Sequence, residues 1–100
     1  MTSIMEFTAE IEAYLAEKYP EKWLNWESFP KALMYIVSEC AEAMEAWRDD
    51  NKGAAGEELA DIAIRLFHTA SALGIDLDEE IRLKMEVNKS RPVHHGRKKI

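Results

Sequence analysis

The feature of this sequence that most constrains its fold is a helical spacing of apolar residues, which recurs in four segments. Within each segment, apolar side chains follow one another at steps of three or four residues, as they do on one face of an α-helix. The apolar and polar residues do not alternate anywhere as they would in a half-buried strand. With 100 residues, the chain has the size of one domain. We therefore predict an all-α fold, a four-helix bundle-type subunit with antiparallel core helices.

Capping residues predict where the first two helices begin. Ser3 and Glu6 have the spacing of a capping box, and Pro20 ends the segment that follows them. An aromatic-rich connector leads to Ser28 and Pro30, and a proline is tolerated in the first turn of a helix. The second helix is therefore expected to begin at about these two residues.

Turn residues separate the last two predicted helices. The segment 49–56 is polar and contains glycine, so we read it as a turn and start the third helix at about residue 55. Gly74 is suited to the position just after the end of this helix. Asp76 is suited to the N-cap of a fourth helix over residues 77–89. The predicted domain covers residues 1–90, and residues 91–100 form a basic C-terminal tail.

Two apolar stripes predict how the central helices pack. The stripe of the second helix consists of Leu33, Val37, Cys40, Met44 and Trp47, and that of the third consists of Leu59, Ile62, Leu66 and Leu73. A short turn makes the two helices antiparallel neighbours, so we expect these stripes to pack together. Ile64 and Phe67 lie on the opposite side of the third helix. Since a helix with two apolar sides is central to a bundle or lies at a subunit interface, we also expect assembly as a helical oligomer.

The charges are unevenly distributed and limit the possible partners. All 19 acidic residues lie in residues 1–88, together with 8 of the 13 Lys and Arg residues, although the net charge of the whole chain is only −6. Such an acidic body disfavours a nucleic-acid-binding surface, because it repels phosphates. No segment of 18 apolar residues is present, so no membrane span is expected. The single cysteine, Cys40, cannot form an internal disulfide, and a cytoplasmic location is expected.

Two pairs of acidic residues are the strongest chemical signal in the sequence. Glu39 and Glu42 are three residues apart in the second helix, and Glu58 and Asp61 are three apart in the third. Residues at this spacing share a helical face, so the hairpin can bring four carboxylates together. Converging carboxylates repel one another unless a cation lies among them, and oxygen ligands suit Mg²⁺ or Mn²⁺. The alternative is that these residues are solvated surface acids, since an acidic chain contains such pairs by chance.

These residues carry a resemblance to a known family. Glu39-Cys-Ala-Glu42 and Glu58-Leu-Ala-Asp61 resemble the E-x-x-E…E-x-x-D signature of the MazG-like, all-α nucleoside triphosphate pyrophosphatases. The segment from Lys84 to Gly96 is similar to short single-domain members. The resemblance implies hydrolysis between the α and β phosphates, which yields a nucleoside monophosphate and pyrophosphate. It also implies that the four acids bind Mg²⁺ and act in catalysis, and that the chain forms a homodimer or a homotetramer.

Other residues are candidates for binding the nucleoside triphosphate. Lys84, Asn88 and Arg91 share a face if the fourth helix reaches that far, and this face could receive the phosphates. Tyr35 and Trp26 are candidates for stacking on the nucleobase, with core or interface packing as the alternative.

Arg65 lies one turn after Asp61 on the same face, where it could pair with an acid or contact phosphate. The leading prediction is an Mg²⁺-dependent nucleoside triphosphate pyrophosphohydrolase. The alternative is a non-catalytic helical module that retains the fold for oligomerisation or for nucleotide sensing.

Overall fold

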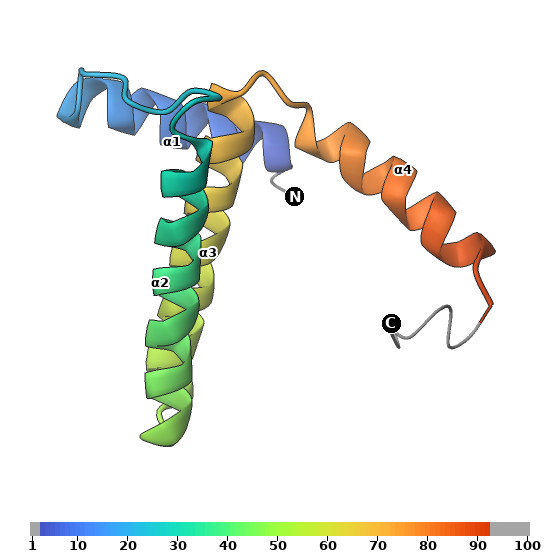
Figure 1. The fold of residues 1–100 in the computed structure, drawn as a ribbon. Coiled ribbons are helices and arrows are strands. Elements are labelled where there is room, and N and C mark those ends of the chain that lie inside the picture. Colours follow the sequence, from blue (N-terminus) through green and yellow to red (C-terminus); the bar gives the residue numbers. More distant parts are fainter. Residues whose placement is uncertain (1–2, 93–100) are drawn as a thin grey trace.

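The computed structural model describes residues 3–92, and within this range it contains four helices and no strand (Figure 1). The helices are α1 (Ile4–Lys18), α2 (Phe29–Arg48), α3 (Lys52–Ala72) and α4 (Leu77–Ser90). The predicted all-α class is therefore confirmed. None of these four helices combines the length and the hydropathy that are needed to span a bilayer.

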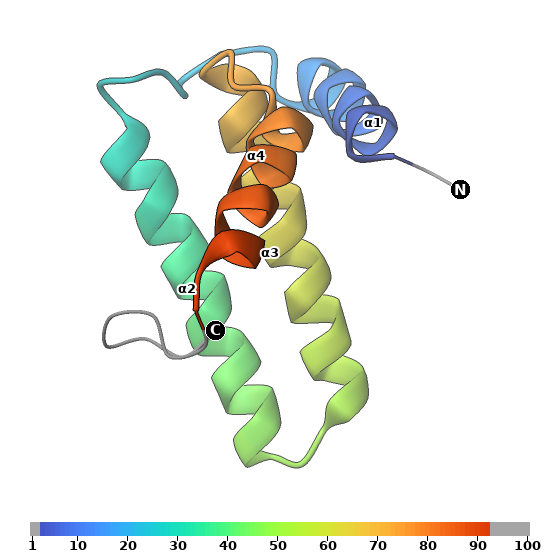
Figure 2. The same cartoon turned by 90° about the vertical axis from the view of Figure 1, so that its right-hand side faces the viewer.

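An antiparallel hairpin of α2 and α3 is the central feature of the fold (Figure 2). The two helices pack side by side. α1 crosses α3 near the C-terminal end of α3 (Figure 1). α4 leads away from the hairpin and does not pack against α2. The single subunit therefore differs from the predicted four-helix bundle, because only three of its helices form a packed unit.

The capping residues explain most helix ends. At α1 the predicted capping box is present, since the Ser3 hydroxyl accepts from the Glu6 backbone N–H at 3.1 Å. At α4 the Asp76 carboxylate accepts from the Glu79 N–H at 3.1 Å, as predicted. The prediction was wrong at the start of α3, which begins at residue 52 and not at about 55. The side chain of Asn51 caps α3 by accepting a hydrogen bond from the Ala54 backbone N–H at 3.0 Å. This bond outweighs the low helix propensity of Gly53 in the first turn.

The end of α3 depends on a glycine, as predicted. Gly74 adopts a φ of 70°, which is in the left-handed region that other residues rarely enter. Its N–H donates to Ser71 O at 3.0 Å, and the N–H of Ile75 donates to Ala70 O at 2.8 Å. These two bonds form a Schellman motif, which turns the chain from α3 into α4.

The contact between α2 and α3 consists mainly of small and charged residues, with one isoleucine from each helix. The least exposed positions of α2 are at Ala32, Ile36, Glu39, Ala43 and Ala46, and those of α3 that share one face are at Ala55, Glu58, Ile62, Arg65 and Thr69. Both sets step by three and four residues, so each forms one face of its helix. We call these ten positions the seam. The acidic residues Glu39 and Glu58 therefore lie inside the hairpin contact.

The predicted apolar stripe of α2 lies outside the seam, which corrects the prediction. Leu33, Val37, Met44 and Trp47 are exposed, with 43%, 53%, 50% and 72% of their surface accessible, and we call these four residues the outer apolar face. Cys40 is exposed as well. Each of these residues follows a seam position by one, so α2 is rotated by about 100° from the predicted orientation. On α3, Leu59 and Leu66 are also exposed, although they were predicted to pack in the hairpin.

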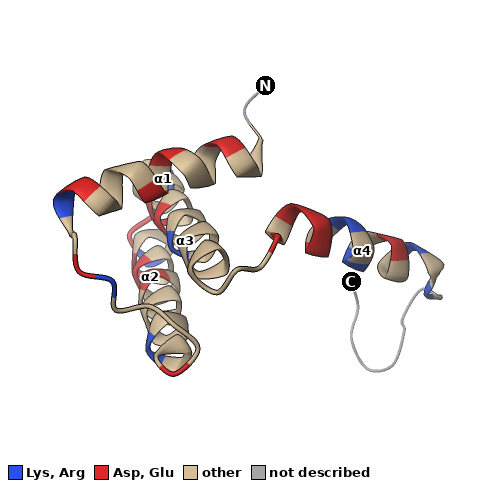
Figure 3. Ribbon diagram, turned by 90° about the horizontal axis from the view of Figure 1, so that it is seen from above, with Lys and Arg blue, Asp and Glu red and all other residues tan. Residues whose placement is uncertain are grey.

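Acidic and basic residues alternate along α4, but its first turn is acidic and its last turn is basic (Figure 3). Three acidic residues lie in its first turn and Lys89 lies in its last turn, an order that complements the helix dipole. The Arg82 guanidinium donates to the Asp78 carboxylate one turn earlier, at 2.8 Å. α4 is therefore stabilised mainly from within.

Candidate metal centre

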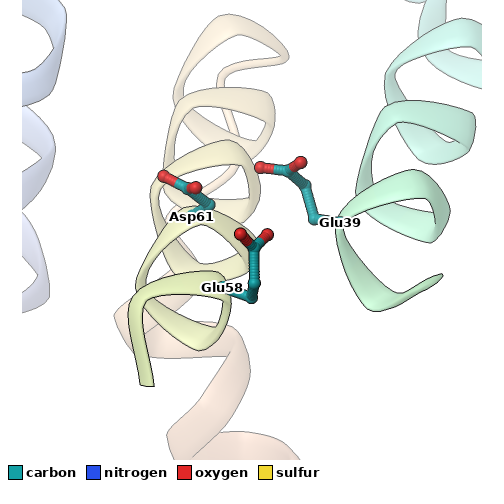
Figure 4. Close-up of side chains that lie close together, drawn as sticks. All are labelled: Glu39, Glu58 and Asp61. Carbon is teal, nitrogen blue, oxygen red and sulfur yellow. The ribbon is translucent and has the colours of Figure 1, made fainter. Parts of the chain in front are cut away.

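Three carboxylates from the two hairpin helices meet at one point. Glu39 extends from α2 toward Glu58 and Asp61 of α3 (Figure 4). One oxygen atom from each side chain lies within 4.8 Å of the other two. This closeness follows from the seam, because Glu39 and Glu58 occupy facing positions and Asp61 lies one turn after Glu58. We call these three residues the carboxylate cluster.

The burial of the cluster tests whether its residues fit a metal ion. The side chain of Glu39 is only 13% exposed, and Glu58 is half-buried. The Oε2 atom of Glu58 is buried and has no hydrogen-bond partner within the described residues. A buried carboxylate oxygen without a partner loses its hydrogen bonds to water and gains none in the protein. This destabilises the folded state by about 1–3 kcal/mol or more. A divalent cation would supply that partner, and a set of carboxylate oxygens is what Mg²⁺ or Mn²⁺ requires.

Asp61 is exposed, so the cluster opens to solvent on one side. Mg²⁺ keeps several of its ligand positions for water or for substrate phosphates, and an open side provides room for them. The cluster is therefore better suited to a metal ion that also binds a substrate than to a structural metal ion that is enclosed by protein ligands.

Electrostatics at Glu39 agree with this arrangement. Burial raises the pKa of the Glu39 carboxyl above its ordinary value of 4.5, and a hydrogen bond with Glu42 raises it further. The nearby Arg65 guanidinium lowers this pKa, but the charges of Glu42 and Asp61 raise it again. Without a metal, the cluster therefore favours a proton on Glu39.

The raised pKa predicts how the stability of the metal-free protein depends on pH. Below pH 4.5 Glu39 is protonated in the folded and the unfolded state alike. Between this value and the folded-state pKa, the folded state binds the proton more tightly than the unfolded state, so the free energy of unfolding falls as the pH rises through the folded-state pKa. We expect Glu39→Gln to reduce this fall, because glutamine cannot ionise. Urea unfolding in EDTA from about pH 4 to about pH 8 measures both slopes, and parallel slopes for the two proteins would contradict the assignment.

Arg65 connects the carboxylate cluster to an aromatic group. Its Nε atom lies 3.6 Å from Oε2 of Glu39 across the seam. Its Cζ atom lies 4.8 Å from the centroid of the Tyr35 ring, one turn before Glu39 on α2. Trp23 meets the edge of the same ring, with centroids 5.7 Å apart. A cationic and aromatic surface therefore continues directly from the carboxylates.

A comparison with protein-family models gives one match. The model described as the MazG-like family matches residues 31–99, which include both acidic pairs and most of the described helices. The chain belongs to the MazG-like family. Searches of the curated proteins and of the solved structures gave no match. Membership of this MazG-like family suggests a nucleoside triphosphate pyrophosphatase, and the family is generally metal-dependent.

The hairpin of this MazG-like chain brings three of its four signature acids together. Glu42 lies one turn after Glu39 on α2 and raises the pKa of Glu39, but it is exposed and is not one of the three that meet.

The candidate phosphate-binding residues of α4 are not at the cluster within one subunit. Lys84 and Asn88 lie on α4, which leads away from the hairpin and does not pack against α2 (Figure 1). The helix does not reach Arg91, which follows its last residue in an extended conformation, so the predicted shared face holds only for Lys84 and Asn88. Asn88 and Arg91 are half-buried, while Lys84 is exposed. These residues remain predicted substrate contacts of the MazG-like chain, and one subunit alone does not bring them to the carboxylates.

The two aromatic candidates differ in their surroundings. Tyr35 lies beside Arg65 and the cluster, whereas Trp26 is 71% exposed and stacks on Phe29 with centroids 5.4 Å apart. The sequence reasoning missed Lys31, whose Nζ lies 5.4 Å from the Trp23 ring centroid and 5.9 Å from that of Tyr35. Its spacing of four residues from Tyr35 is the signal that could have found it.

Proposed function

We propose that this MazG-like protein is an Mg²⁺-dependent nucleoside triphosphate pyrophosphohydrolase. It would cleave between the α and β phosphates and release a nucleoside monophosphate and pyrophosphate. The observation that carries the proposal is the carboxylate cluster, in which a buried oxygen of Glu58 lacks a partner within the described residues. Family membership supports the same activity.

Each acidic residue has a proposed part in this reaction. Glu39, Glu58 and Asp61 would hold Mg²⁺, and Glu42 would complete the set from the open side. The bound ion would neutralise charge on the phosphates and lower the pKa of a water molecule. One of these carboxylates would also orient the attacking water by accepting a hydrogen bond from it.

The proposed substrate contacts lie on two sides of the cluster. Tyr35 and Trp26 would contact the nucleobase by stacking. Lys84, Asn88 and Arg91 would contact the phosphates, from a second copy of the chain, because their own subunit does not bring them to the carboxylates. We therefore include a homodimer or homotetramer in the proposal. The exposed outer apolar face supports it, since four large apolar side chains on one helix face need a cover.

Product analysis tests the proposed reaction. Purified protein is incubated with Mg²⁺ and a panel of ribo- and deoxyribonucleoside triphosphates, and the products are separated by ion-exchange chromatography. We expect equimolar nucleoside monophosphate and pyrophosphate from at least one substrate, and no release with EDTA present. Release of orthophosphate and a diphosphate would contradict cleavage between the α and β phosphates. Binding without turnover across the panel would favour a nucleotide-sensing module.

A further inference from the structure

We propose that Arg65 binds the polyphosphate of the substrate, and that it is more than a structural partner of Glu39. The inference rests on the proposed function and adds a residue to it. It begins from the position of Arg65, whose side chain is 42% exposed and whose guanidinium lies at the edge of the carboxylate cluster.

The contact between Arg65 and Glu39 is too long to hold either side chain by hydrogen bonding. At 3.6 Å, the Nε–Oε2 distance exceeds the usual 2.7–3.2 Å of an N–H···O bond. Within residues 3–92, no hydrogen bond from this guanidinium is present. An arginine that served only to fix a carboxylate would make the two-pronged contact for which its shape is suited.

The guanidinium of Arg65 is positioned by the Tyr35 ring and not by Glu39. Cζ lies 4.8 Å from the ring centroid, so the planar group is held against an aromatic surface by a cation–π contact. The backbone of Arg65 is fixed as well, because it belongs to the seam and its carbonyl accepts from the Thr69 hydroxyl at 2.7 Å. The side chain is thus pre-organised while its N–H groups remain available to a ligand.

Charge then determines which ligand fits. A divalent ion among Glu39, Glu58 and Asp61 would lie close to the positive guanidinium, so Arg65 opposes binding of the metal alone. An anion that contacts the metal and Arg65 together removes this repulsion. A polyphosphate meets this requirement, because its oxygens bind Mg²⁺ and accept paired hydrogen bonds from arginine. Arg65 should therefore make metal and polyphosphate bind cooperatively.

Arg65→Gln distinguishes this role from a purely structural one. Isothermal titration calorimetry measures the affinity for Mn²⁺ alone, and then for inorganic tripolyphosphate at a fixed excess of Mn²⁺. We expect the variant to bind Mn²⁺ at least as tightly as the wild type, and to bind tripolyphosphate at least about fivefold more weakly. If Arg65 only held Glu39 in place, the variant would lose affinity for Mn²⁺ itself.

Control variants keep the result interpretable. Arg48→Gln removes the same charge from an exposed pair with Glu45 near the far end of α2, and both affinities should remain unchanged. Arg65→Lys keeps the charge without the planar fork, and it replaces Arg65→Gln if circular dichroism shows that the latter is unfolded. We expect it to leave Mn²⁺ binding intact and to weaken tripolyphosphate binding.

Two outcomes would overturn the inference. One is a weaker affinity for Mn²⁺ in Arg65→Gln, and the other is a loss of tripolyphosphate affinity smaller than about fivefold, which includes no binding by the wild type. The proposed function fails separately, if wild-type protein releases no pyrophosphate from any triphosphate. The two binding measurements do not depend on turnover, so they test the role of Arg65 in polyphosphate binding whether or not the protein is a pyrophosphohydrolase.

Discussion

Pyrophosphate release is expected to fall by about a thousandfold or more in Glu58→Gln and in Asp61→Asn. Each amide keeps the size of the side chain but removes one negative charge from a group of oxygens within 4.8 Å of one another. A divalent ion loses a charged ligand in either variant, and several kcal/mol of transition-state stabilisation depend on that ion. Steady-state rates at saturating Mg²⁺, with pyrophosphate as the measured product, test this expectation.

The same two variants should be more stable than the wild type when no metal is present. The carboxylates of the cluster repel one another without a cation, and the buried Oε2 of Glu58 has no hydrogen-bond partner within the described part of the chain. Relief on the order of 1 kcal/mol corresponds to an increase in Tm of about 4–8 °C for a domain of this size. Thermal unfolding in EDTA measures it. Added Mg²⁺ should raise the Tm of the wild type and have little effect on the variants.

Glu57 provides a matched control for Glu58. It is adjacent in the sequence, carries the same charge and is exposed, but it is not part of the cluster. Glu57→Gln should therefore retain activity and show no increase in Tm. If Glu58→Gln lowered the Tm in EDTA, or if both variants retained activity, the carboxylate cluster would not be the metal centre.

The sequence could predict how the acids pair within each helix, because this depends on local spacing, but it could not predict which three of the four acids meet. Acids three residues apart share a helical face, and a short turn places α2 beside α3. The contact of Arg65 with Tyr35 could not be predicted in the same way. It depends on how far α2 is rotated about its own axis, and local spacing does not fix this rotation.

The rotation of α2 was predicted wrongly for a physical reason. The stripe that begins at Leu33 contains the larger side chains, so it was assigned to the hairpin contact. The structure uses the neighbouring face, where Ala32 and Ala46 are buried and permit close approach of the helices. Glu39 belongs to this alanine face. Burying it is unfavourable in a metal-free chain, and the hydrophobic pattern cannot reveal a position that a metal would make favourable.

The placement of α4 could not be predicted either. Its start was correct because Asp76 is a strong N-cap, a local property. Ile81, Leu83, Met85 and Val87 are exposed in the single subunit and lie on more than one side of the helix. No single apolar face therefore directs α4 against its own hairpin.

The outer apolar face provides the second prediction with a large effect. We expect the wild-type protein to be a dimer or a tetramer, and we expect Val37→Glu and Trp47→Glu to be monomers. These side chains are 53% and 72% exposed in one subunit, so a charge there is harmless to the hairpin. In an assembly that covers this face, the same charge would be buried without a partner, which costs several kcal/mol. Light scattering coupled to size-exclusion chromatography measures the mass.

The control for this prediction adds the same charge elsewhere. Ala13 is exposed on α1, away from the outer apolar face, and Ala13→Glu should keep the wild-type mass. A monomeric wild type at micromolar concentration would contradict the proposed assembly. If the monomeric variants keep their helical circular dichroism and their Mn²⁺ affinity but lose turnover, the carboxylate cluster is complete within one subunit and the phosphate contacts are not. That result would agree with the position of Lys84 and Asn88 on a helix that leads away from its own hairpin.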